Sequence, residues 1–227
     1  MTSTRSTDLM RGWIDEEVSA NLPEWLHVFC DAVAQSRTED FTAFLPPAHG
    51  GREGAVLVLL GETDGHPDLL IIERAHDMRS HAGQPAFPGG AIDPQDGGPV
   101  AAALREAVEE TGLDPHGVEV FGTLPLLYLP PSNFLVTPVL GYWRQPSPVS
   151  VVDASEVASV HRVPIAELAD PDNRMRVRGP LGYVGFGFSV AGLVMWGFTA
   201  GVVNGLLDLG GWSRPWERDR IIDWDPS

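Results

Sequence analysis

A short helix with two unlike faces constrains this chain more than any other feature of its sequence. Pro99 suits the first turn of a helix and Gly112 suits the position just past its end, so the sequence predicts a helix over residues 99–111. Successive side chains stand about 100° apart around a helix axis, which divides this segment into two faces. The apolar face, which we expect to lie against the core, comprises Leu104, Ala107, Val108 and Thr111. The charged face comprises Arg105, Glu106, Glu109 and Glu110.

The charged face is electrostatically unfavourable for the helix that carries it. Glu106 and Glu110 are four residues apart with like charge, and Glu109 lies with Glu110 in the last turn, beside the negative end of the helix dipole. Each effect costs roughly a few tenths of a kcal/mol on an exposed helix. A hard divalent cation such as magnesium or manganese would turn both into attractions. Taken alone, however, the helix is explained better by solvated glutamates and an Arg105–Glu109 ion pair.

The charge balance and the cysteine content exclude several kinds of protein. A formal net charge of -16 and a pI near 4.6 leave few of the clustered cations that a nucleic-acid surface needs. All fifteen basic residues are arginine, which excludes mechanisms that need a phosphate-loop lysine or a Schiff-base lysine. Cys30, the single cysteine, lies in an apolar-periodic run, so we expect a buried structural thiol. The polar first residues carry no secretory signal, and we expect a cytoplasmic protein.

One long uncharged segment has some features of a membrane span. No charge occurs from Tyr183 to Leu207, and glycine recurs at positions 197, 201 and 205, as in helices packed within membranes. The glycine-broken, aromatic residues 183–192 suit a strand instead, and the residues left for a helix, 193–209, are too few to span comfortably. We therefore expect a buried strand followed by a core helix whose glycines permit close approach to a sheet, with no membrane insertion.

Changes in residue pattern along the chain predict a main domain with two appendages. Residues 1–50 read as a helical arm, residues 51–210 as the main domain and residues 211–227 as a polar tail. Two apolar runs separated by a turn-rich link predict a hairpin over residues 54–75. Further strands are expected within residues 118–130, 134–143 and 157–164. A long loop rich in glycine and proline, residues 80–99, leads into the helix, and such loops often carry function.

The end of this loop and the helix together form a longer motif. Gly90 is followed by five residues, then by Asp96, an eight-residue spacer and the stretch REAVEETGL at 105–113. This arrangement resembles the signature of the Nudix hydrolase family, in which Arg-Glu-x-x-Glu-Glu-x-Gly and an aliphatic residue follow a glycine and an acidic residue. Two differences stand in the first half. The early acid is aspartate rather than glutamate, and the spacer is one residue longer than the standard form.

The upstream loop resembles one branch of that family, the coenzyme A pyrophosphatases. In that branch an arginine-containing element and a Phe-Pro-Gly-Gly turn precede a box of this spacing. The residues in the matching places are Arg74, Arg79, Gly83, Phe87, Pro88, Gly89 and Gly90. Pro85 departs from the aliphatic residue usual at its place. The resemblance covers about residues 54–207 and implies an α/β fold, a Nudix-type α/β/α sandwich with a mixed β-sheet.

The resemblance also implies a reaction and a set of site residues. It implies hydrolysis of the diphosphate bond of coenzyme A or its derivatives to 3',5'-ADP and 4'-phosphopantetheine, with Mg²⁺ or Mn²⁺ as cofactor. The metal ligands would be Gly90, Glu106, Glu109 and Glu110. Glu106 is preferred over Glu156 as the base that activates water, and Arg105 would support the glutamates from the same helix face. The residues expected at the substrate, with the two arginines on its phosphates, are Arg74, Arg79, Gly83, Phe87 and Asn133.

Three functions of different kinds stay open at this point. The first is the coenzyme A diphosphatase, and the second is a Nudix hydrolase of another nucleoside diphosphate derivative, such as NADH, ADP-ribose or an oxidised dNTP. The third is a nucleotide-binding module without turnover, which the intact glutamate face disfavours because clustered carboxylates repel an anionic ligand. In each case we expect a small nucleotide as partner, no nucleic-acid polymer and no membrane. A homodimer is compatible with the sequence.

Overall fold

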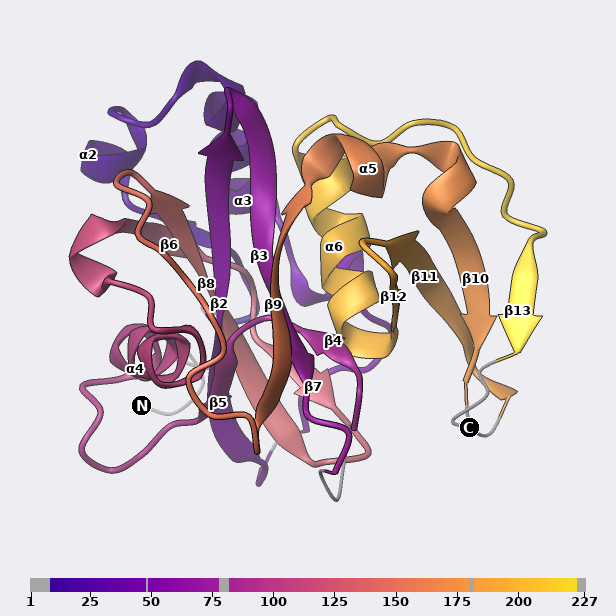
Figure 1. Cartoon of the computed structure of the whole chain (residues 1–227), viewed down its shortest axis with the longest axis horizontal. Coiled ribbons are helices and arrows are strands. Elements are labelled where there is room, and N and C mark those ends of the chain that lie inside the picture. Colours follow the sequence, from indigo (N-terminus) through magenta and orange to yellow (C-terminus); the bar gives the residue numbers. More distant parts are fainter. Residues whose placement is uncertain (1–8, 48, 78–81, 180–181, 224–227) are drawn as a thin grey trace.

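The computed structural model describes residues 9–47, 49–77, 82–179 and 182–223. Within these residues, a nine-stranded mixed sheet is covered by helices on both faces, which confirms the α/β/α sandwich (Figure 1). The strands of this main sheet are β1 (Trp13–Ile14), β2 (Arg52–Thr63), β3 (His66–Arg74), β4 (Pro85–Ala86), β5 (Gly89–Ala91), β6 (Val118–Thr123), β7 (Leu127–Leu129), β8 (Phe134–Trp143) and β9 (Val157–Pro164). The α-helices are α2 (Glu16–Ser19), α3 (His27–Gln35), α4 (Pro99–Thr111), α5 (Ile165–Ala169) and α6 (Gly197–Leu209). Short 3-10 turns are η1 (Glu24–Leu26), η2 (Thr38–Asp40), η3 (Pro115–Gly117) and η4 (Pro171–Asn173).

The main sheet is built around the parallel pair β2 and β8. Its order is β1-β6-β8-β2-β3-β4, with β5 on β2, β7 on β8 and β9 on β3. The predicted hairpin is confirmed as β2 and β3, which pair antiparallel up to Thr63 and His66. Asp64 and Gly65 between them both have positive φ, at 51° and 76°, as a two-residue hairpin turn requires. The other strands expected from pattern are also present, but the loop over 80–99 contains β4 and β5.

The central strand β2 divides the interior into two apolar layers. Its side chains alternate between the faces of the sheet, so Leu57 and Leu59 pack against α4 while Val58 and Leu60 pack in the layer that holds α3 and α6. The α4 layer is lined by alanines of the helix, and the other layer by larger side chains. The α4 helix consequently lies close to the middle of the sheet.

The helix α4 has the predicted bounds but is rotated from the predicted orientation. Gly112 ends it in the left-handed conformation, at φ 70°, and donates its N–H to Val108 O at 2.9 Å. Each expected face was wrong at one place: Val108 of the apolar face is 36% exposed, and Glu110 of the charged face is 3% exposed. The helix packs on the sheet through Ala103 as well as the predicted Ala107, and both are fully buried. Glu110 follows these two residues on the same stripe, so it is buried.

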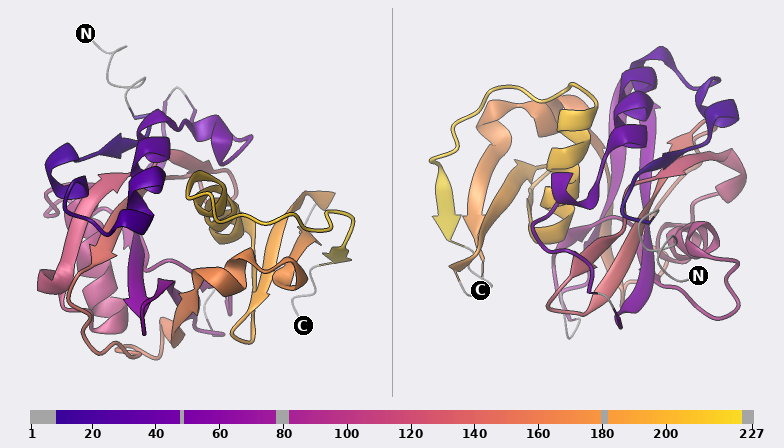
Figure 2. Two further views of the ribbon diagram at one scale, coloured as in Figure 1. Left: turned by 90° about the horizontal axis from the view of Figure 1, so that it is seen from above. Right: turned by 180° about the vertical axis from the view of Figure 1, so that it is seen from behind.

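A second, four-stranded sheet follows the main one in the chain. Its order is β12-β11-β10-β13, and its strands are β10 (Arg174–Arg178), β11 (Val184–Val190), β12 (Leu193–Trp196) and β13 (Ile221–Asp223). The helix α6 lies between the two sheets (Figure 2), and residues of both sheets share one core with it. Among the described residues, no helix is long and apolar enough to cross a membrane.

The segment 183–209 differs from expectation at the start of its helix. A strand over the first part is confirmed, but residues 193–196 form β12, and α6 begins only at Gly197. Gly197 has a φ of 66°, which interrupts any helix that would start earlier. The glycine spacing serves contact with the N-terminal segment rather than with a sheet, because a Cβ at Gly205 would lie 2.5 Å from the ring of Phe41.

Segments from the N-terminal and C-terminal parts of the chain pack against the main sheet and α3. Strand β1 pairs with β6, and Trp25 donates its Nε1–H to Glu62 of β2 at 2.7 Å. The ring of Trp212 stacks on Phe29 of α3 at 5.6 Å between centroids. Cys30 is 5% exposed, as predicted, and burial raises the pKa of its thiol to about 11. The division into an arm, a main domain and a tail remains a prediction.

Candidate functional site

A pair of glycines lets the loop before α4 pass between the sheet and the helix. Strand β5 pairs with β2, with Gly90 opposite Ala55. A Cβ at Gly89 would lie 2.3 Å from Ala55 O, and a Cβ at Gly90 would lie 2.5 Å from Glu106 Oε1. A side chain at Gly89 would collide with the backbone of β2, and a side chain at Gly90 would displace the carboxylate of Glu106, since real Cβ atoms essentially never come within 3.0 Å of other heavy atoms. The glycines thus bring the backbone of β5 against the carboxylate of Glu106.

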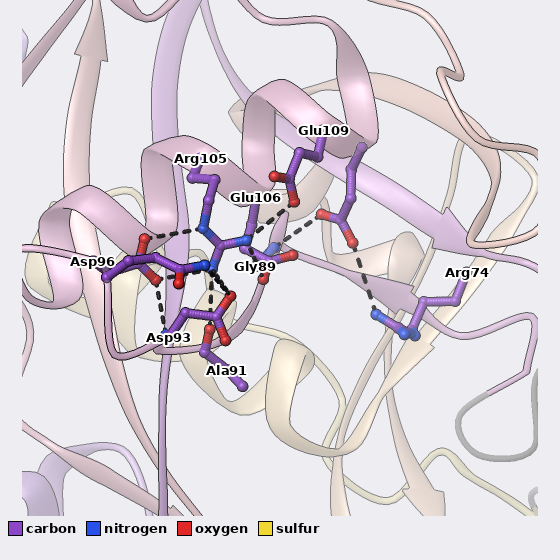
Figure 3. A network of polar contacts seen from close by, with 10 residues as sticks. Arg74, Gly89, Ala91, Asp93, Asp96, Arg105, Glu106 and Glu109 are labelled. Carbon is purple, nitrogen blue, oxygen red and sulfur yellow. Dashed lines mark hydrogen bonds and ion pairs between the residues drawn. The ribbon is translucent and has the colours of Figure 1, made fainter.

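Arg105 ties this loop to the helix through Asp96. Its Nε donates to Asp96 Oδ1 at 3.0 Å and its Nη2 to Asp96 Oδ2 at 2.9 Å, a two-pronged contact that fixes the plane of the guanidinium. The hydrogen bond from Arg105 lowers the pKa of Asp96, assisted by the N–H of Asp93. Nη2 also donates to Ala91 O at 3.2 Å. Figure 3 shows the guanidinium between Asp96 on one side and Glu106 and Glu109 on the other.

The same guanidinium holds two glutamates of the helix. Its Nη1 donates to Glu106 Oε1 and to Glu109 Oε2, both at 3.0 Å. The side chain of Glu109 is 56% exposed and that of Glu106 is 18% exposed. Burial raises the pKa of Glu106, Arg105 opposes this rise, and the charges of Glu109 and Glu156 add to it. Arg105 therefore donates hydrogen bonds to three carboxylates and lies 3.9 Å from a fourth, that of Asp93, so negative charge exceeds positive charge around it.

Glu110 is the buried member of the glutamate group. Its Oε2 accepts the N–H of Gly89 at 2.9 Å, and its Oε1 lies 3.9 Å from Arg74 Nη1. Burial raises the pKa of Glu110 to about 8, against the opposing effects of Gly89 and Arg74 and with added repulsion from Glu106 and Glu156. The buried carboxylate and the partly exposed arginine together place opposite charges beside β5.

The remaining predicted residues are brought to different places. Gly83 has a φ of 65°, and its N–H donates to Arg74 O at 3.1 Å, which closes the turn after β3. Phe87 is 2% exposed and packs in the core with α3 and α6, so its placement indicates packing rather than substrate contact. Asn133, at φ 55°, forms the β7–β8 turn, where its Oδ1 accepts from Tyr128 at 3.1 Å. Arg79 lies outside the described residues.

Glu156 lies in the turn that precedes β9. Its N–H donates to Asp153 O at 3.1 Å, and its own carbonyl accepts the N–H of Ala75 at 2.9 Å. Its side chain is exposed, and its charge acts on Glu106 and Glu110. The structure therefore brings Glu156 near the acidic face from an element remote in sequence.

Two contacts of the site were not foreseen from sequence. Asp96 is the two-pronged partner of Arg105, although its shorter side chain and the longer spacer left its role open. The position of this acid in the motif was the available signal. The hydrogen bond from Gly89 to Glu110 is donated by a backbone N–H, so no residue type in the sequence indicates it.

The donor atoms of the acidic face suit a hard divalent cation. Glu106, Glu109 and Glu110 offer carboxylate oxygens. Burial, with a smaller contribution from neighbouring carboxylates, raises the pKa of Glu106 and Glu110, and a nearby cation would oppose this rise. Within the described residues, no three His, Cys, Asp or Glu side chains are grouped as a metal site. Two of the three glutamates, Glu106 and Glu109, accept hydrogen bonds from Arg105.

The chain is similar to several known proteins. The model of the NUDIX domain matches residues 51–180. The protein of Citrobacter koseri named "Uncharacterized Nudix hydrolase NudL" is 38% identical over 162 residues, which cover 68% of this chain and 81% of that protein. The NudL protein of Cronobacter sakazakii is 45% identical over 116 residues, covering 51% of this chain and 59% of that protein, so the chain spans less than two thirds of this relative. A crystal structure of a Nudix hydrolase from M. smegmatis, RenU, is 20% identical with a TM-score of 0.48, covering 72% of this chain and 88% of that one.

The family match covers more than half of the chain and includes β5, the Asp96–Arg105 contact and the three glutamates of α4. The match to the Citrobacter koseri relative extends over two thirds of the chain. The chain therefore belongs to the Nudix family.

Proposed function

We propose that this chain is a metal-dependent hydrolase of the diphosphate bond in coenzyme A or its derivatives, releasing 3',5'-ADP and 4'-phosphopantetheine. The observation that carries the hydrolase proposal is the excess of carboxylates around a single fixed arginine, Arg105, at the surface of α4. A pure binding module for anionic nucleotides gains nothing from such an excess. The choice of coenzyme A rests on the loop from Arg74 to Gly90, which resembles that of coenzyme A pyrophosphatases.

The residues proposed to hold Mg²⁺ or Mn²⁺ are Gly90, through its carbonyl, and Glu106, Glu109 and Glu110. When bound, the cation would neutralise diphosphate oxygens and polarise the attacked phosphorus. Gly89 orients Glu110 by its N–H, and Arg105 orients Glu106 and Glu109. These side chains thus need little rearrangement within the helix to act together.

Water attack and substrate binding are assigned to residues around that face. Glu106 is our preferred acceptor of the water proton, and Glu156 is the alternative. Arg74 binds phosphate oxygens, because its 3.9 Å separation from Glu110 is longer than a hydrogen bond and leaves Nη1 available. Arg79 has the same proposed role on grounds of sequence alone.

The test is product analysis with a panel of substrates. Coenzyme A, NADH, ADP-ribose and 8-oxo-dGTP are each incubated with the full chain and either Mg²⁺ or Mn²⁺, and the products are identified by mass. We expect 3',5'-ADP and 4'-phosphopantetheine as the dominant products at low substrate concentration. Preferred cleavage of another member of the panel would move the proposal to that diphosphate derivative. Binding without turnover of any of them would reject the hydrolase.

A further inference from the structure

A chain of polar contacts links β3 and β9 at the residue before Arg74. Ser159 Oγ donates to Glu73 Oε2 at 2.7 Å and lies 2.6 Å from His161 Nε2. His76 Nε2 stands 3.4 Å from the other carboxylate oxygen of Glu73. The hydroxyl of Ser159 has a single hydrogen, which it donates to Glu73. In the contact between Ser159 and His161, the donor is therefore the Nε2–H of His161 and the acceptor is the oxygen of Ser159. The group therefore has a definite direction, from His161 through Ser159 to Glu73.

The ladder between these strands is regular up to this point and irregular just beyond it. Glu73 pairs with Ser159, but the next residue of β3, Arg74, pairs with Val157. Ala158 is thus an extra residue in β9, a β-bulge. Because of the bulge, the carbonyl that receives the N–H of Ala75, at 2.9 Å, is that of Glu156. A regular ladder would place Val157 opposite Ala75 instead.

The bulge lies between the two side chains that approach the acidic face from outside α4. Arg74 on β3 points its Nη1 toward Glu110 at 3.9 Å, and Glu156 directly precedes the first residue of β9. Bulges near active sites commonly re-aim a side chain. Here the extra residue, Ala158, places Arg74 opposite Val157. It also shifts Glu156 by one position along β3.

The position of such a bulge is weakly determined by the backbone alone. Within the described strands, β9 pairs with β3 and no other strand, so one ladder holds its register. Moving the bulge past the Glu73 pair changes few backbone hydrogen bonds, but it separates Ser159 from Glu73. The half-buried hydrogen bond from Ser159 to Glu73, at the last regular pair, opposes a shift of the bulge.

We propose that Ser159 and Glu73 are positioning residues that hold the bulge and thereby aim Arg74 and Glu156 at the acidic face. The catalytic part of this inference rests on the proposed function, because it takes Arg74 as a phosphate ligand. The structural part, that the hydroxyl bond holds the bulge, does not depend on it. Neither Ser159 nor Glu73 touches the substrate in this proposal.

The test compares Ser159→Val with Ser159→Thr. The two replacements have the same shape and both suit a strand, but only threonine keeps the hydroxyl. Thr63→Val is the matched control, since Thr63 Oγ1 donates to Asp68 Oδ2 at 2.6 Å in the same hairpin, at the opposite end of β3. The measurements are amide hydrogen exchange at Ala75, and kcat and KM for the diphosphate that the unmodified chain cleaves best.

We expect Ser159→Val to speed exchange at Ala75 by at least about tenfold and to raise KM by about tenfold, with both restored in Ser159→Thr. Loss of folded protein alone would lower the apparent kcat and leave KM unchanged. Unchanged exchange and KM in Ser159→Val, or equal changes in Thr63→Val, would overturn the proposal. If the unmodified chain cleaves no diphosphate, the proposed function fails, while the exchange at Ala75 still decides whether the hydroxyl holds the bulge.

Discussion

Arg105 and Arg174 are both held by several partners, but the charges around them differ. Arg105 donates hydrogen bonds to three carboxylates, lies 3.9 Å from a fourth and keeps part of its surface exposed. Arg174 of β10 is 1% exposed and contacts neutral groups: Asn204 Oδ1 at 2.6 Å and Ser213 Oγ at 2.9 Å. Its guanidinium also lies 4.8 Å from the ring centroid of Trp216. Asn204 in turn donates to Asp208 Oδ2 at 3.0 Å, and the charge of Asp208 opposes the effect of burial on the pKa of Arg174.

The net charge around each arginine indicates whether its site can bind a further ion. Hydrogen bonding to Asp96 raises the pKa of Arg105, whereas burial lowers that of Arg174. Around Arg105 negative charge exceeds positive, and the site can accept a further cation. Around Arg174 the positive charge is matched by dipoles and aromatic rings, and its contacts join α6, β10 and the residues after α6. We therefore assign chemistry to the first arginine site and stability to the second.

We expect the largest effect, on catalysis and Mn²⁺ binding, when carboxylates are removed from the site around Arg105. Replacing both Glu109 and Glu110 by glutamine removes two carboxylates while keeping their shape, so kcat/KM should fall at least about 1000-fold and Mn²⁺ binding should weaken in parallel. Steady-state kinetics and Mn²⁺ titration followed by electron paramagnetic resonance measure the two quantities. Glu167→Gln, an exposed carboxylate on α5, is the control and should change neither. Full activity in the double variant would remove the basis of the proposed function.

The second effect is on stability at the other arginine. Arg174→Met should lower the free energy of unfolding by about 3 kcal/mol. The substitution removes a buried hydrogen bond, and the buried Oδ1 of Asn204 loses the donor that Arg174 provides. Urea unfolding measures this, and KM should stay unchanged. Arg178→Met on the same strand removes an exposed pair with Asp223 and should cost less than about 1 kcal/mol. A changed KM in Arg174→Met would contradict the division between chemistry and stability.

A third prediction separates the charge of Arg105 from its shape. Arg105→Lys keeps the positive charge but cannot contact Asp96 with two parallel hydrogen bonds. We expect kcat/KM to fall roughly 30-fold. Arg144→Lys is the matched control, since Arg144 makes a similar two-pronged contact with Glu119, at 2.8 and 2.6 Å, outside the site. Equal kinetics for the two variants would show that the shape of Arg105 is unimportant.

The smallest effect concerns that surface pair and its pH dependence. Arg144 lowers the pKa of Glu119, so the folded state gains stability above the pKa of the unfolded state and loses it as pH falls through the lowered value. Glu119 is 38% exposed, so solvent screens the pair and the contribution should be under about 1 kcal/mol. Unfolding of the unmodified chain and of Glu119→Gln, compared from neutral to acid pH, measures it. A difference that grows toward acid pH would have the wrong sign.

Local features of the chain were predictable from the sequence. Pro99 and Gly112 bound α4, and Asp64 with Gly65 makes the turn of the β2–β3 hairpin. Such signals act within a few residues, through fixed or positive φ, and need no distant partner. The spacing of Arg105 and the glutamates also predicted the family, because it is a property of one helix. The burial of Cys30 followed from the same kind of periodicity.

The tertiary structure decided which face of each element is buried and what it meets. Glu110 became buried and Val108 exposed because α4 approaches β2 along its alanines, which its own periodicity does not specify. Pairing of β5 with β2 fixes the course of the loop before α4. The loop therefore buries Phe87 in the core and brings Asp96 into contact with Arg105. The bulge beside Ser159 depends on the pairing of β3 with a strand more than eighty residues away. Burial and pairing are set by partners distant in sequence, and a local pattern has no access to them.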